Sequence, residues 1–152
     1  MLEASLAAFI HEGLAAHIGT RNARLEPNGA RVTAVKVEDD RRHVVVYVPK
    51  AASRSILEDL RANRQAAVAI VRPTDDKACQ LKGEFVDAWA ATAAERPFVM
   101  QQWQGFLTQL DLVGLPPAAA ENWQVWPCVA LRIRVTTLFD QTPGPQAGAP
   151  LA

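Results

Sequence analysis

The chain has 152 residues, and its 16 lysines and arginines balance 16 aspartates and glutamates, so the formal net charge is zero. This length suits one domain with a core of its own. No long run of either sign occurs, so we expect neither a nucleic-acid partner nor a membrane partner. No apolar stretch reaches the roughly 20 residues of a membrane helix, and the N-terminus lacks a signal-peptide pattern. Cys79 and Cys128 lack metal-ligand spacing, so a reduced, cytoplasmic protein is expected.

An amphipathic helix is predicted near the N-terminus, because apolar residues recur there at helical spacing. They are Leu2, Leu6, Phe9, Ile10 and Leu14. The helix is expected to end at Gly13 or Gly19. The short segments 16–20 and 31–38 follow, and the turn-forming cluster Glu26-Pro27-Asn28-Gly29 lies between them. This arrangement predicts a β-hairpin.

The clearest buried strand is 43–48, which is rich in β-branched residues and stops at Pro49. A short helix is predicted to follow as far as Asn63, because Ser55 and Glu58 have the spacing of a capping box. The chain then returns as a strand over 66–71.

Three further elements complete the predicted fold. Apolar and polar residues alternate over 79–89 and again over 129–135, which predicts two strands. Between them, apolar residues at helical spacing over 99–113 predict the longest helix, ended by Gly114. We expect one domain over 1–140 and a Pro- and Gly-rich tail over 141–152. Many short antiparallel strands with few helices favour a small barrel, mainly β with flanking helices.

Four segments, spread from about Ile18 to Gly148, resemble the FMN-binding split-barrel family related to pyridoxamine 5′-phosphate oxidase. They are Ile18-Gly19-Thr20-Arg21, the strand 44–49 followed by Leu60-Arg61-Ala62-Asn63, the segment Gln80-Leu81-Lys82-Gly83, and the closing stretch 138–148. The closing stretch is similar to the tail of an uncharacterised subgroup. The resemblance implies a six-stranded antiparallel split β-barrel. It also implies a homodimer that holds FMN between the two barrels.

The same resemblance implies a cofactor-binding strand with the pattern Arg-x-x-x-x-Lys, from Arg31 to Lys36. Arg31, Val32, Thr33 and Lys36 are therefore candidate cofactor-binding residues. A guanidinium can bind the FMN phosphate through two hydrogen bonds, so the side chain of Arg31 is chemically suited to hold the cofactor. The alternative is that Arg31 and Lys36 are ordinary exposed strand residues.

A phosphate-binding cluster is implied just before the short helix, where helix N–H groups also point outward. Lys50, Ser53 and Arg54 occupy that neighbourhood, with Arg54 the better phosphate candidate. The sequence departs from the family here, because Ile56 stands where the cluster's lysine would fall unless the loop carries an extra residue. Ser55 is interpreted as a helix cap instead.

Gln80 begins a segment that lies near the flavin ring in similar proteins, where an amide could bind ring atoms. An exposed strand glutamine is the alternative. Trp123 and Trp126 are interpreted as interface or core residues, and Arg132 and Arg134 as exposed structural residues. No metal site is predicted, because the three histidines lack metal-ligand and catalytic-triad spacing.

The leading hypothesis is an FMN-dependent oxidoreductase that transfers hydride through flavin N5 with an unknown small substrate. No catalytic residue is assigned. One alternative is a flavin- or ligand-binding module without turnover. Another is a cofactor-free dimeric split barrel. Haem binding, seen in some relatives of this fold, lacks a persuasive axial ligand here.

Overall fold

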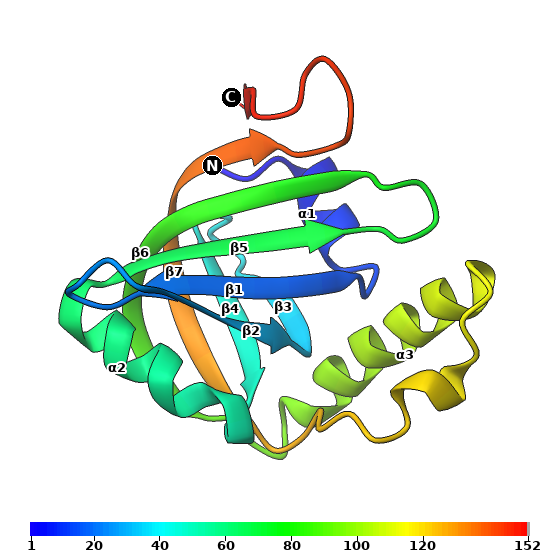
Figure 1. Ribbon diagram of the computed structural model, residues 1–152, viewed down its shortest axis with the longest axis horizontal. Coiled ribbons are helices and arrows are strands. Elements are labelled where there is room, and N and C mark those ends of the chain that lie inside the picture. The colour runs from blue at the N-terminus through cyan, green and yellow to red at the C-terminus, as the bar shows by residue number, and fades with distance from the viewer. Residues whose placement is uncertain (152) are drawn as a thin grey trace.

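The computed structural model describes residues 1–151, which form one antiparallel sheet of eight strands with helices at its edges (Figure 1). The strands are β1 (Ala15–Arg21), β2 (Pro27–Val32), β3 (Ala34–Val37), β4 (His43–Pro49), β5 (Gln65–Val71), β6 (Ala78–Ala90), β7 (Cys128–Asp140) and β8 (Pro150–Leu151). Their order is β2-β1-β5-β6-β7-β4-β3, and β8 pairs with β7. The helices are α1 (Ala4–Ile10), α2 (Ser53–Asn63) and α3 (Arg96–Leu112), with 3₁₀ turns at Lys50–Ala52 and Pro117–Ala120. No helix among the described residues is long and apolar enough to cross a membrane.

The sheet curls into a half-barrel because its two long strands bend. β6 and β7 each contain 13 residues, and their register shifts between Lys82 and Gly83 and again between Phe85 and Asp87. Such bulges increase the local twist and bend a strand. A Cβ atom on Gly83 would collide with the carbonyl oxygen of Arg134, so this close approach depends on the glycine.

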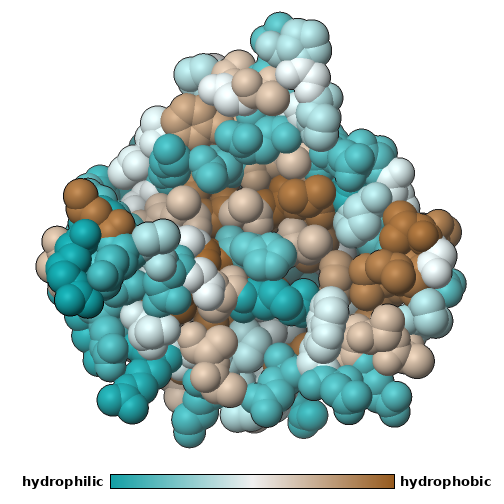
Figure 2. Space-filling model, viewed as in Figure 1, coloured by the Kyte–Doolittle hydropathy of each residue, from teal (hydrophilic) through white to brown (hydrophobic). Residues whose placement is uncertain are grey.

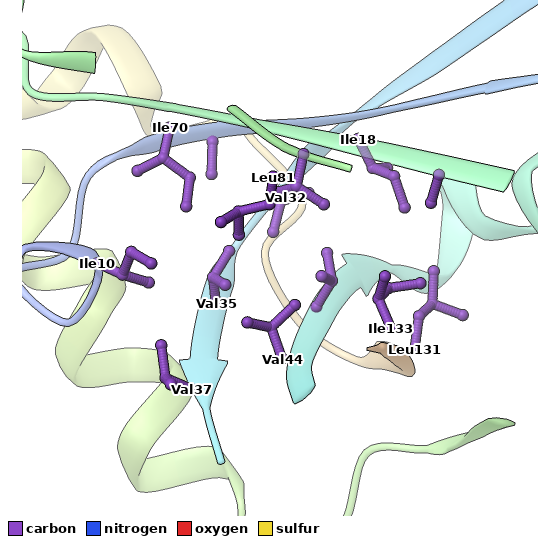
Figure 3. Close-up of a cluster of buried hydrophobic side chains, with 14 of the residues drawn as sticks. Ile10, Ile18, Val32, Val35, Val37, Val44, Ile70, Leu81, Leu131 and Ile133 are labelled. Atoms are coloured by element: carbon purple, nitrogen blue, oxygen red, sulfur yellow. The ribbon is translucent and has the colours of Figure 1, made fainter. Parts of the chain in front are cut away.

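The core fills the inside of the curl (Figure 3). Alternate strand residues point inward, as the period of two requires. Its labelled members are Ile10, Ile18, Val32, Val35, Val37, Val44, Ile70, Leu81, Leu131 and Ile133. α1 closes the core with Phe9 and Ile10, which are buried. On β3, β4 and β7 the opposite face is partly buried in a second cluster with Val99 of α3. The outward side chains of β1 and β5 are left to form a surface.

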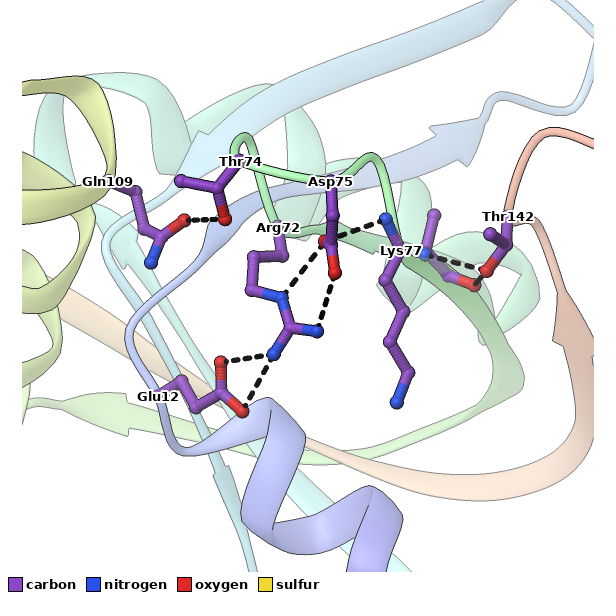
Figure 4. Close-up of polar contacts among 8 residues, drawn as sticks. Glu12, Arg72, Thr74, Asp75, Lys77, Gln109 and Thr142 are labelled. Atoms are coloured by element: carbon purple, nitrogen blue, oxygen red, sulfur yellow. Dashed lines mark hydrogen bonds and ion pairs between the residues drawn. The ribbon is translucent and has the colours of Figure 1, made fainter. Parts of the chain in front are cut away.

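Polar contacts tie the β5–β6 turn to its two neighbouring helices (Figure 4). Arg72 binds Glu12, just after α1, at 3.0 Å and Asp75 at 2.7 Å. Thr74 in the same turn donates to Gln109 of α3 at 2.8 Å. These contacts hold α3 beside the sheet, although exposed ion pairs contribute little individually.

The mainly β antiparallel barrel predicted from the sequence is confirmed, with two more strands than six. One extra strand arises because segment 31–38 is not continuous. It breaks at Thr33, whose N–H donates to Tyr47 and whose hydroxyl donates to Val125. β2 then pairs with β1, while β3 pairs with β4. The β8 pairing adds the other strand.

The Pro- and Gly-rich segment that follows residue 140 is attached to the sheet by β8, which pairs with β7, and Ala152 lies outside the described residues. Two local predictions were wrong. The hairpin turn lies at 22–26, because Pro27, Asn28 and Gly29 pair with β1 as part of β2. The capping box is absent, because α2 begins at Ser53 and no side chain caps it. Glu58 pairs with Arg54 instead.

Candidate functional site

The outward face of β2, β1, β5 and β6 brings chemically useful residues into one line across the sheet. Strand register places Arg31 opposite His17, His17 opposite Ala69, and Ala69 opposite Gln80. We call Arg31, His17, Ala69 and Gln80 the outer row. Figure 1 shows α2 and α3 on either side of this face. Figure 2 shows hydrophilic side chains beside small apolar ones in its middle.

The middle of this face carries almost no side-chain bulk. In the line next to the outer row, Gly29 is opposite Gly19, Gly19 opposite Ala67, and Ala67 opposite Lys82. Three strand spacings separate β2 from β6, a width of about 14 Å. A groove of about 740 Å³ opens on the same face, with Gly19, Ala67 and Lys82 in its lining. The surface can therefore receive a planar group between Arg31 and Gln80.

Arg31 lies at one end of the outer row, where its side chain contacts three aromatic rings. Its guanidinium carbon is 4.0 Å from the ring centroid of Trp123, and 5.5 and 5.3 Å from those of Trp103 and Phe106. Burial lowers the pKa of Arg31, but a guanidinium stays charged at neutral pH. Among residues 1–151 no carboxylate forms an ion pair with it. Its charge is thus available to an anionic group.

His17 is a polar member of the outer row that sequence reasoning missed. Burial lowers the pKa of His17, and the nearby charge of Arg31 lowers it further. The imidazole is therefore neutral at pH 7 and offers one donor and one acceptor nitrogen. The signal was present in the alternation of residues 15–21, which puts His17 and Gly19 on the outward face.

The Arg-x-x-x-x-Lys segment does not stay together on one surface. Val32 points into the core and is 3 % exposed. Thr33 is buried, and its hydroxyl donates to the Val125 carbonyl at 3.1 Å. Lys36 lies on β3, and its ammonium is 5.9 Å from the ring centroid of Phe98. Of the four, only Arg31 belongs to the outer row.

The predicted phosphate cluster lies at the start of α2. A hollow of about 360 Å³ is lined there by Ala51, Ala52, Arg54, Ser55 and Glu58. The Ser53 N–H donates to the Lys50 carbonyl. Because no side chain caps α2, the next N–H groups of its first turn can donate to an anion. Lys50 is exposed nearby, and the Ser53 hydroxyl donates to its carbonyl at 2.9 Å. Arg54 is 92 % exposed and binds Glu58 at 3.2 Å, so this hollow carries charges of both signs.

A second cluster contains Glu38, Asp40 and His43, whose ligand atoms lie within 4.8 Å of one another. Arg132 binds both carboxylate oxygens of Glu38. Asp40 accepts two backbone N–H bonds and binds the His43 ring, and these contacts lower the pKa of Asp40 to about 2. A cation would have to compete with the Arg132 guanidinium, so we interpret the cluster as a surface ion-pair network.

No family model matches the sequence, and no curated protein matches it either. Solved structures do share its fold. An F420 reductase superposes with a TM-score of 0.61 at 15% identity, over 90% of this chain and 98% of that one. HupZ of Group A Streptococcus has a TM-score of 0.58 at 16% identity, over 97% of this chain and 100% of that one.

A third match is a pyridoxamine 5′-phosphate oxidase-related, FMN-binding protein from Nostoc punctiforme. Its TM-score is 0.51 at 12% identity, over 95% of this chain and 87% of that one. These matches span nearly whole chains, so the architecture is shared from end to end. At such identities the likeness concerns the fold.

Proposed function

Because this chain folds as a split barrel like the pyridoxamine 5′-phosphate oxidase-related proteins, we propose that it binds FMN on its outer sheet face and acts as an oxidoreductase. One observation carries the proposal. Ala69 lies between His17 and Gln80 in the outer row, and the adjoining line on the same face carries the small residues Gly19 and Ala67. This surface suits a flat, polar-edged ring system that must lie close to the backbone.

The outer row supports binding of the flavin ring. The Gln80 amide carries both a donor and an acceptor for ring oxygen and nitrogen atoms. Neutral His17 can donate or accept as well, without bringing a charge beside the ring. Ala69 lies between them and adds only a methyl group, so the backbone can be approached closely.

Phosphate binding is supported at the uncapped start of α2, with Arg54 and Lys50 as the cationic groups. Arg54 would exchange its exposed partner Glu58 for the phosphate, which costs little because such pairs are weak. Arg31 is a second candidate. Lys36 and Ser53 stay predictions, and the buried side chains of Val32 and Thr33 leave only their backbone groups for such a role.

When bound, FMN would supply hydride transfer at N5. The chain's own residues would bind the ring edges, exclude water from the face that lies on Ala67 and Ala69, and keep His17 neutral. A binding module without turnover is the second candidate, because no acidic side chain of the described residues belongs to the outer row.

The proposal includes a homodimer. The flavin's second face would be exposed on the outer row, and a partner barrel would cover it, as the sequence resemblance implies. A reduced, cytoplasmic setting also suits the chain, because Cys79 and Cys128 are both buried, unpaired thiols.

The test is retention of flavin by the purified protein. FMN is added, the excess is removed by gel filtration, and visible absorption is recorded for wild type, Ala69→Leu and Ala90→Leu. The first variant places a larger side chain in the outer row, whereas Ala90 is exposed at the far end of β6. We expect Ala69→Leu to weaken FMN binding about tenfold or more, a loss of at least ~1.4 kcal/mol, and Ala90→Leu to leave it unchanged.

Failure of wild type to retain FMN would sink the proposal and favour a cofactor-free barrel. Equal retention in the two variants would exclude the outer row as the ring site. Bleaching of bound flavin by NADH or NADPH without oxygen would separate an oxidoreductase from a binding module.

A further inference from the structure

The groove of about 740 Å³ lies beside the outer row and runs to the end of α2. Its lining includes three cationic side chains: Arg21 at the end of β1, Arg64 just after α2, and Lys82 on β6. A volume of this order lies within the range of small-molecule sites. None of these three residues belongs to the outer row or to the hollow at the start of α2.

The groove carries uncompensated positive charge. Among the residues that the structure describes, Arg21, Arg64 and Lys82 form no ion pair. Glu84 also lines the groove, but Arg134 binds its carboxylate at 2.7 Å. Three cations therefore face the groove without a matching anion, and a concave surface concentrates their field.

Neutral groups hold two of the cations in place. Arg21 donates to the Gln65 side-chain oxygen at 2.9 Å, and Arg64 donates through Nε to the Phe85 carbonyl at 3.0 Å. The Lys82 ammonium lies 4.9 Å from the ring centroid of Phe139. These partners order the side chains without neutralising them, so the remaining N–H donors are pre-positioned.

The backbone at Arg64 supports a role for its side chain. Arg64 has φ 61°, in the left-handed region at the end of α2. Glycine adopts this conformation at lower cost and is the usual residue there. Arginine is thus not required to end the helix, and its side chain brings a positive charge to the groove.

The floor of the groove leaves room for a ligand. Gly19, Ala67 and Gly83 form part of it and bring almost no side-chain bulk. The hydroxyl-bearing Thr136 and Thr137 lie along the same lining. Cations over a small-residue floor, with hydroxyl groups beside them, suit a phosphate group.

We propose that this groove is an anion-binding subsite for a phosphate-bearing small molecule, a second reactant beside the outer row. The α2 helix has 11 residues, so its two ends lie about 16 Å apart. The groove is at its C-terminal end, and the hollow proposed for the FMN phosphate is at its N-terminal end. The proposal extends the proposed function but does not require that FMN binds.

Isothermal titration with inorganic pyrophosphate, without flavin and at low salt, tests the subsite. We expect wild type to bind, and Arg64→Gly and Lys82→Gln each to weaken binding about tenfold or more. Arg61→Gln is the matched control, because Arg61 is exposed on α2 and does not line the groove. Thermal unfolding separates binding from folding, since Arg64→Gly should not lower Tm.

Three outcomes would overturn the proposal: wild type that does not bind pyrophosphate, an equal loss in Arg61→Gln, or variants that change only the dimer dissociation constant. Binding of FMN and of riboflavin, which lacks the phosphate, then identifies the source of the anion. Variants that weaken FMN but not riboflavin binding would keep the anion site and assign it to the cofactor's phosphate. Equal FMN binding in wild type and variants would support a second reactant, and absence of all flavin binding would leave the pyrophosphate result intact.

Discussion

At the scale of single residues, His11 should make the stability of the fold vary with pH. Its Nε2 accepts a hydrogen bond from the Val37 N–H at 2.9 Å, and its ring contacts Phe98 edge-on with centroids 5.6 Å apart. Burial lowers the pKa of His11, and the charge of Lys36 lowers it further. The unfolded chain, with an imidazole pKa of about 6.5, therefore takes up a proton before the folded chain does.

Because the unfolded chain is protonated first, acid should destabilise the folded protein. The contribution of neutral His11 to stability is complete above pH ~6.5 and is lost as the pH falls through the lower folded pKa. Chemical denaturation of wild type should show less stability at pH 5.5 than at pH 7.5. His11→Gln, which keeps an acceptor but does not titrate, should reduce this difference. An unchanged pH dependence in the variant would assign it to other groups.

At the scale of elements, one side chain attaches α3 to the edge strand β3. Gln102 is 4 % exposed. Its amide accepts from the Val35 N–H and donates to the Val35 carbonyl, both at 2.9 Å. It therefore pairs with β3 as a neighbouring strand would, and it protects an otherwise open sheet edge.

Gln102→Ala should destabilise the fold by about 2–4 kcal/mol, because it leaves two buried backbone groups of Val35 without partners. Gln104→Ala is the control, since Gln104 is exposed on the same helix, and it should change stability by less than ~0.5 kcal/mol. Urea denaturation monitored by tryptophan fluorescence measures both. A similar small effect in the two variants would mean that apolar packing alone holds α3.

Sequence patterns predicted these elements well where they depend on neighbours along the chain. The β-branched segment 43–48 and the helical spacing over 99–113 correspond to β4 and α3. Both signals are local, since burial on one face imposes a period of 2.0 or 3.6 residues. Two features have no such local signal. One is the break at Thr33, and the other is that α2 begins at Ser53, two residues before the predicted cap Ser55. The break at Thr33 follows from its hydrogen bonds to Tyr47 and Val125, which are distant along the chain. At the start of α2, the buried Ser53 donates to the Lys50 carbonyl.

At the scale of the whole molecule, flavin binding and dimer formation should be coupled. If each site uses a partner barrel, as we propose, diluting the dimer should release flavin. We expect flavin fluorescence to rise over the same range of protein concentration in which sedimentation shows dimers becoming monomers. Flavin retained by monomers would contradict the shared site and place FMN on one chain alone.

The sequence by itself determined which residues face inward and which face outward, because alternation along a strand and spacing along a helix are properties of a short segment. Alternation thus placed Gln80 on the polar face of its strand, whereas the family resemblance singled out Arg31. Only the tertiary structure decided that His17 and Ala69 lie between them, and that Arg21, Arg64 and Lys82 share one groove. These neighbours come from distant parts of the chain, and their register depends on strand pairing and on the bulges of β6 and β7.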